Sequence, residues 1–170
     1  MATQPRIAFQ AVKPLVGLSI PQENFPEAAT QTFKQGACVR LTAGYLGECG
    51  ADPELIMGIA SREGQSGSAA GDKNQSVYLA HPATLFMGSL DDGAGTYASL
   101  ATDRGKMYGI AKHSGTGKWY VDSGDTTNKR VIIWGFWTGV QDGVAAAVGD
   151  YLTWVLFQFD PTYFQGSHTS

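Results

Sequence analysis

Short apolar segments separated by glycine-containing turns are the feature that most restricts how this chain can fold. The 170 residues include 22 glycines, and the turn signals recur at a spacing of about 8–12 residues, which is typical of β-sandwiches and barrels. The 3.6-residue periodicity of an amphipathic helix occurs only weakly, around residues 144–148. The sequence therefore predicts an all-β fold, a single small jelly-roll-like or β-barrel-like sandwich.

The expected strands are short and rich in aromatic and β-branched residues. We predict one domain over residues 31–164, followed by a short C-terminal tail over 165–170. The segments with strand character are 37–41, 45–49, 55–60, 76–80, 84–87, 97–101, 107–111, 119–122, 129–140 and 151–159.

The first 30 residues differ from the rest of the chain. Four of the seven prolines lie within the first 26 residues, and proline disfavours helices and interior strands. The segment also carries apolar residues that disordered tails usually lack. We therefore predict an extended N-terminal arm over residues 1–30 that lies against a neighbouring protein and makes its contacts through Ile7, Phe9, Leu15, Leu18 and Phe25.

Charge argues against nucleic acid as a partner, and hydropathy argues against a membrane. Charged residues make up 16% of the chain and the net charge is −3, with no cluster of lysine and arginine of the kind that nucleic-acid binding requires. No apolar run approaches the length of about 18 residues that a transmembrane helix needs. We expect neither nucleic-acid nor membrane binding.

The N-terminus has no charged start followed by an apolar run, so the sequence predicts no signal peptide and synthesis in a cytoplasm. Cys38 and Cys49 are accordingly expected to be reduced core residues. They lie at opposite ends of an expected hairpin, so an intrachain disulfide is the alternative.

The segment HSGTGKW, residues 113–119, resembles a phosphate-binding loop but lacks two of its parts. The position five before Gly117 is Lys112 and not glycine, and Lys118 is followed by Trp119 where Ser or Thr is needed to hold magnesium. The interpretation that fits is a hairpin tip in which Gly115 and Gly117 take positive φ.

No residue pattern indicates catalysis. His81, His113 and His168 lack the spacing of a metal site, and no nucleophile elbow occurs. Asp122 and Asp125, like the pair at 91–92, could offer oxygens to calcium, but the order of a calcium-binding loop is missing; turns capped by aspartate are the favoured interpretation. We predict no enzymatic activity and no cofactor.

The segment VIIWGFW, residues 131–137, is apolar on both faces of a strand. Such a strand is either covered on both sides within one chain or presents one face to another subunit, and aromatic residues are enriched in interface cores. The closing strand over residues 151–159 has the same ambiguity. Two such strands in a small sandwich favour self-association, with candidate interface residues Trp134, Phe136 and Trp154.

In several ordered segments the chain resembles the head-decoration, or capsid cement, proteins of tailed bacteriophages. The likeness runs from about Glu27 to Phe159 and begins with PEAATQTFKQGACVRLTAGYLGECGADPELIMGIA. It continues with VYLAHPATLFMGSL and closes with YGI (108–110), WYVD (119–122), RVIIWGF (130–136) and VGDYLTWVLFQF (148–159).

The resemblance implies a protein on the outer surface of the virion capsid. Such a protein binds the major capsid protein of the expanded head, strengthens its joints against packaged DNA, and forms homo-oligomers, with a trimer favoured over a dimer. It implies no activity and no cofactor. The alternative class is a jelly-roll module that binds host-surface glycans through exposed Trp119, Tyr120 or Trp137 beside carboxylates or amides. An enzyme of another type would show a cleft in which buried carboxylates converge.

Overall fold

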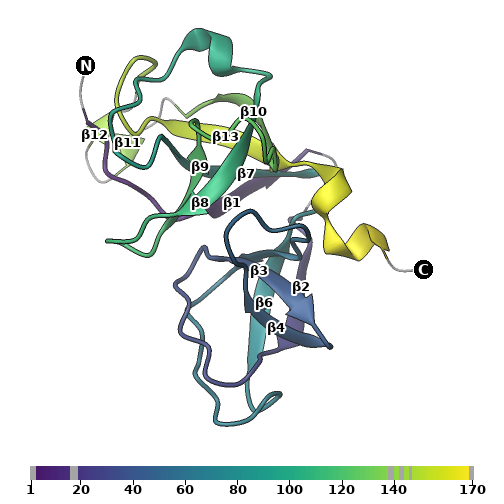
Figure 1. Cartoon of the computed structure of the whole chain (residues 1–170). Helices are drawn as coiled ribbons and strands as arrows, with labels where there is room; N and C mark the ends of the chain where they lie inside the picture. The colour runs from purple at the N-terminus through teal and green to yellow at the C-terminus, as the bar shows by residue number, and fades with distance from the viewer. Residues whose placement is uncertain (1–2, 16–18, 138–139, 142–143, 146, 169–170) are drawn as a thin grey trace.

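The computed structural model describes residues 3–15, 19–137, 140–141, 144–145 and 147–168. These residues form an all-β protein built from a closed barrel and a second sheet (Figure 1). The predicted small sandwich or barrel is confirmed. Among the described residues, no helix has the length and apolar character to cross a membrane.

The barrel is a ring of five strands. Four of the five neighbouring strand pairs in the ring are antiparallel, and the parallel pair of β7 with β9 closes it. In ring order the strands are β7 (Thr84–Asp91), β13 (Trp154–Phe159), β10 (Val131–Phe136), β8 (Met107–Lys112) and β9 (Trp119–Asp122).

The second sheet holds five antiparallel strands in the order β2 (Gln22–Pro26), β6 (Asn74–Leu79), β5 (Gly58–Ala60), β3 (Cys38–Thr42) and β4 (Tyr45–Glu48). β11 (Val140–Gln141) and β12 (Val144–Ala145) pair with each other as a separate two-stranded sheet. The predicted strand at 97–101 does not form: the segment makes a single isolated bridge, Ala98 with Tyr151, and ends where the short turn η1 (Ala101–Asp103) begins.

One apolar core runs through both units. Its barrel end is an aromatic cluster in which the rings of Phe86 and Phe159 lie 5.0 Å apart and those of Phe9 and Phe157 4.8 Å apart. The same cluster of buried residues extends through Val39, Ile59 and the rest of the second sheet. The two sheets are therefore joined by shared apolar burial, which is the main stabilising term in folding.

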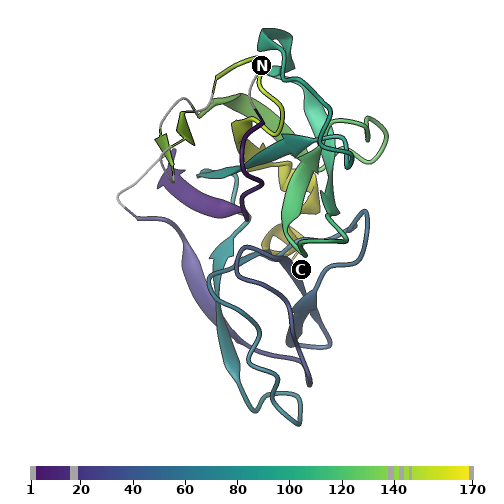
Figure 2. The same ribbon diagram turned by 90° about the vertical axis from the view of Figure 1, so that its left-hand side faces the viewer.

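The N-terminal segment belongs to the fold itself. β1 (Gln10–Pro14) pairs with β7 beside the barrel, and β2 pairs with β6 in the second sheet. Figure 2 shows the chain crossing the barrel before it enters β1. The predicted arm that reaches out to a neighbour is therefore wrong for this segment: its apolar residues supply strands and core to its own chain.

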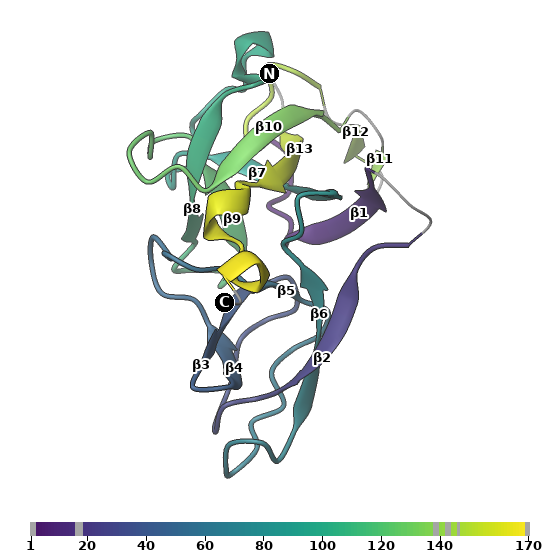
Figure 3. The same cartoon turned by 90° about the vertical axis from the view of Figure 1, so that its right-hand side faces the viewer.

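The C-terminal turns η2 (Pro161–Tyr163) and η3 (Gln165–His168) lie where the two units meet (Figure 3). Arg130 is buried there and donates hydrogen bonds to the carbonyls of Pro53 (2.6 Å) and Asp52 (3.3 Å). Its guanidinium carbon lies 4.0 Å from the centroid of the Tyr163 ring. Arg130 thus ties the barrel, a loop of the second sheet and the C-terminal segment together.

The hairpin prediction for residues 113–119 is confirmed. β8 and β9 pair on either side of it, and positive φ is found at Gly117 but not at Gly115. Lys118 donates to the carbonyl of Arg6 at 2.8 Å. The two cysteines are free and buried, and burial raises the pKa of Cys49 to about 12.

Candidate functional site

Three of the predicted contact residues are buried within their own chain. Phe9, 2% exposed, packs among the barrel phenylalanines. Ile7, Met87 and Trp154 form a small cluster on the outside of the barrel, where the Trp154 indole donates to the carbonyl of Pro5 at 2.9 Å. Ile7 and Phe9, predicted as arm contacts with a neighbour, and Trp154, predicted at a subunit interface, are buried instead because the N-terminal segment packs on its own barrel.

The remaining predicted contact residues differ in how far their side chains are exposed to solvent. Phe25 and Phe136 are half-buried and pack against the main core. Leu15 is exposed at the end of β1, and Leu18 lies outside the described residues. Of the three proposed interface residues only Trp134 is exposed, at 50%.

A β-bulge explains the exposure of Trp134. Ile133 pairs with Phe157 and Gly135 with Leu156, so Trp134 is an extra residue in β10 without a partner in β13. Its indole turns along the outer face and donates to the Gln158 side chain at 2.8 Å. Bulges of this kind re-aim side chains next to functional sites, and this one presents a large aromatic ring to solvent.

The turn η1 is held against the same edge of β10. Asp103 is fully buried and accepts hydrogen bonds from the Tyr108 hydroxyl at 2.8 Å and the Leu100 backbone at 2.8 Å. Burial alone would raise the pKa of Asp103, but the hydrogen bonds from the Leu100 backbone and from the Lys106, Tyr108 and Tyr97 side chains outweigh it and lower that pKa. Gly105 donates to the Ile133 carbonyl at 2.8 Å, which fastens the turn to the strand.

Arg104 completes this surface. Its guanidinium lies over Gly135: a Cβ atom added at Gly135 would lie 3.8 Å from the nearest guanidinium nitrogen. Among the described residues no carboxylate lies within ion-pair distance of Arg104. We call the hollow of about 240 Å³ lined by Arg104, Gly105, Ile132, Ile133 and Trp134 the Trp134 shelf. β10 faces the viewer in Figure 3.

A larger cleft of about 440 Å³ lies between the loop at 49–52 and the barrel strands β8 and β9. Asp52, Asp122 and Asp125 converge on it, and burial raises the pKa of Asp52 and of Asp122. Asp122 accepts from the Gly124 backbone and Asp125 from the backbones of residues 127 and 128, which confirms the predicted capped turns. Within the described part of the chain, no three His, Cys, Asp or Glu side chains are arranged to hold a metal ion.

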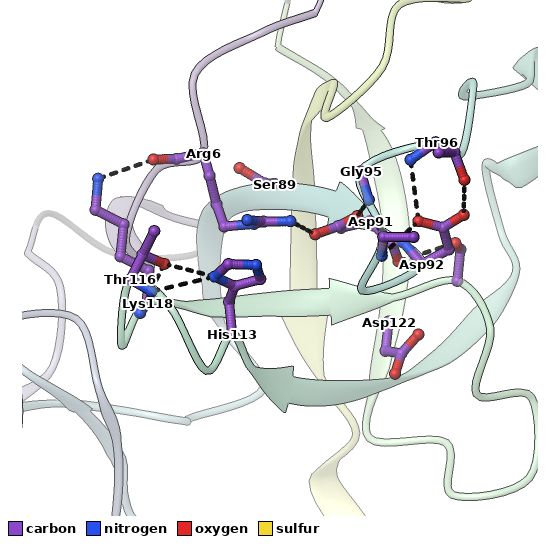
Figure 4. A network of polar contacts seen from close by, with 12 residues as sticks. Arg6, Ser89, Asp91, Asp92, Gly95, Thr96, His113, Thr116, Lys118 and Asp122 are labelled. Carbon is purple, nitrogen blue, oxygen red and sulfur yellow. Dashed lines mark hydrogen bonds and ion pairs between the residues drawn. The ribbon is translucent and has the colours of Figure 1, made fainter.

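A second polar network anchors the N-terminal segment (Figure 4). Arg6 forms an ion pair with the buried carboxylate of Asp91, and its guanidinium carbon lies 5.6 Å from the centre of the Tyr120 ring. Asp91 also accepts from the backbones of Asp92 and Gly95, as predicted for a capped turn. These polar groups serve the fold and are largely covered by it.

The residues predicted for glycan binding are mostly inaccessible. Trp119 is 1% and Tyr120 6% exposed, so neither can stack on a sugar. Trp137 is half-buried, and its indole nitrogen is buried with no hydrogen-bond partner among the residues that the structure describes. His81 accepts from the Ala83 backbone at 3.0 Å and His113 from Thr116 at 3.2 Å; His168 lies in η3.

Comparisons with protein-family models, curated proteins and solved structures find no match to this chain. The Trp134 shelf is therefore defined by geometry alone. Sequence reasoning identified Trp134 and missed Arg104. Gly135 is the sequence feature that could have indicated a group packed over this strand, because an isolated glycine inside an apolar strand indicates a bulge or the close approach of another group.

Proposed function

We propose that this protein is a capsid decoration protein that binds the outside of an expanded tailed-phage head and strengthens the joints between major capsid subunits. The single observation that carries the proposal is the Trp134 shelf. It combines a half-exposed tryptophan with an exposed arginine, and these two residue types dominate the energetics of protein interfaces.

The disposition of the other polar groups supports the same class of function. Asp91 and Asp103 are buried and neutralised by partners from their own chain. The aspartates at 122 and 125 cap turns. These four aspartates therefore have structural roles, whereas the Trp134 ring, held by one hydrogen bond to Gln158, remains half exposed.

The mechanism follows from linkage. A protein that binds the expanded lattice and not the precursor lattice adds its binding free energy to the expanded state. A homotrimer engages several joints at once, and avidity multiplies weak individual contacts. These contacts lie on the outer face of β10, and no N-terminal arm takes part in them.

Binding to expanded heads, compared with precursor heads, tests the proposal. We expect the purified chain to co-sediment with expanded heads only and to raise the temperature at which they release DNA. Trp134→Ser is expected to weaken binding by about 30-fold, equivalent to about 2 kcal/mol, because the anchoring ring is removed.

Tyr45→Ser is the matched control, since Tyr45 is an aromatic residue of similar exposure on β4 in the other sheet. It should leave head binding unchanged. Equal binding to precursor and expanded heads, or none to either, would contradict the proposal. Glycan binding by the isolated protein that depends on Trp134 would favour the alternative module.

A further inference from the structure

We infer that the Trp134 shelf receives an acidic, apolar segment of its protein partner: an aliphatic or aromatic side chain fills the hollow beside Trp134 while a neighbouring carboxylate pairs with Arg104. This inference rests on the proposed function and specifies the chemistry of the surface that the decoration protein recognises. It concerns a contact between two proteins, with the partner on the capsid lattice.

The lining of the hollow favours an apolar side chain of the partner. Ile132 and Trp134 line the hollow from β10 together with Ile133, whose own side chain lies in the main core. The indole nitrogen already donates to Gln158, so the ring offers its face and carbons rather than a hydrogen-bond donor. A volume of about 240 Å³ suits one or two side chains and is below the range of about 300–1,000 Å³ usual for small-molecule sites.

The acidic half of the inference comes from Arg104. Three cations near the barrel pair with carboxylates of their own chain: Arg6 with Asp91, Lys106 with Asp103 and Lys112 with Glu48. Among the described residues Lys13 and Lys129 have no such partner, but neither of them lines the hollow. Arg104 has no carboxylate partner among the residues that the structure describes, although the chain as a whole is acidic, with a net charge of −3. The planar guanidinium, which lines the hollow together with Trp134, is suited to bidentate pairing with a carboxylate.

The geometry also disfavours a two-fold dimer in which the Trp134 shelves of two copies of this chain face each other. In a two-fold pair the same patch meets itself, so the two Arg104 guanidinium groups would approach each other and repel. A partner that offers negative charge avoids this repulsion.

A charge series at position 104 tests the inference on expanded heads. We expect wild type to bind best, Arg104→Gln about tenfold more weakly, and Arg104→Glu at least a further tenfold more weakly at low salt. Raising the ionic strength to 1 M should make the affinities of Arg104→Gln and Arg104→Glu for heads nearly equal, because the Debye length falls to about 3 Å and repulsion is screened. Arg40→Glu is the control, an exposed arginine on β3 of the second sheet.

The outcomes separate this inference from the proposed function. Head binding by wild type with equal affinities for Arg, Gln and Glu at position 104 would overturn the acidic-partner inference and leave the decoration function standing. Loss of self-association in Trp134→Ser or Arg104→Glu, measured by sedimentation without heads, would assign the shelf to a second copy and overturn the inference. No head binding by folded wild type would overturn both.

Discussion

Asp92 illustrates how single side chains stabilise the turn that follows β7. Its carboxylate accepts from the Thr96 hydroxyl at 2.6 Å, the Thr96 backbone at 3.1 Å and the Ala94 backbone at 3.0 Å (Figure 4). Partial burial raises the pKa of Asp92, but these hydrogen bonds together prevail and lower it to about 2. The ionised form is therefore favoured in the folded state.

The lowered pKa predicts an acid-dependent contribution to stability. A folded pKa of about 2, below the ordinary 3.8, means that the stabilisation is complete above the unfolded pKa and is lost as pH falls from about 4 to 2. We expect Asp92→Asn to lower the free energy of unfolding at pH 7 by about 1 kcal/mol after solvent screening, and the difference from wild type to shrink towards pH 2. Urea titrations at several pH values measure this; a difference that stays constant with pH would contradict it.

At the scale of residues, the sequence predicted capped turns well because their chemistry is local. It predicted exposure poorly. Period-2 alternation places Trp134 and Phe136 on one face, yet the bulge shifts the strand after Trp134, so that Phe136 packs against the core. Gly135 signals that some group approaches the strand, but the sequence does not identify that group as Arg104, because its position depends on how η1 docks on β10.

At the scale of elements, β1 and the segment before it act as a cover for the barrel. Phe9 packs directly over β7, where Gly88 lacks a side chain; a Cβ at that position would collide with the Phe9 ring. Removing residues 1–26 would delete β1 and β2 together. Such a deletion tests folding and does not isolate a binding arm.

We expect Phe9→Ala to lower the free energy of unfolding by about 3–5 kcal/mol, since it opens a cavity among Phe86, Phe157 and Phe159. Leu15→Ala, at an exposed position after β1, should change it by less than about 1 kcal/mol. Chemical denaturation of both variants measures the contrast. Similar small losses in the two variants would show that the N-terminal segment is not part of the core.

Most strands between residues 38 and 122 follow the predicted segments closely, because apolar runs and turn signals agree there. β1 and β2 escaped prediction because their prolines stand at strand ends, where a lost backbone donor costs little. Proline content indicates that a segment is not an interior strand, but it does not exclude a strand at a sheet edge.

At the scale of the whole molecule, barrel and second sheet share one core and are bridged by Arg130. All four tryptophans, at positions 119, 134, 137 and 154, lie in the barrel strands or directly after one. Tryptophan fluorescence therefore reports on the barrel, whereas far-UV circular dichroism reports on both units.

We expect the two signals to show one coincident unfolding transition in urea, because neither unit can open without exposing the common core. In Arg130→Ala the transition should move to lower urea by an amount equivalent to about 3 kcal/mol, since three structural segments lose their shared donor. Arg40→Ala, on the exposed side of β3, serves as the control. Two separate transitions in wild type would indicate that the units are independent.

The order of the strands also has a consequence for synthesis on the ribosome. The second sheet is built from residues 22–79, so its strands are complete early. The barrel ring cannot close before β13 at residues 154–159 has emerged, and β1 must wait for β7. A nascent chain stalled before residue 154 would therefore display open barrel edges and the phenylalanines of an unfinished interior, the state in which a β protein is most prone to aggregate.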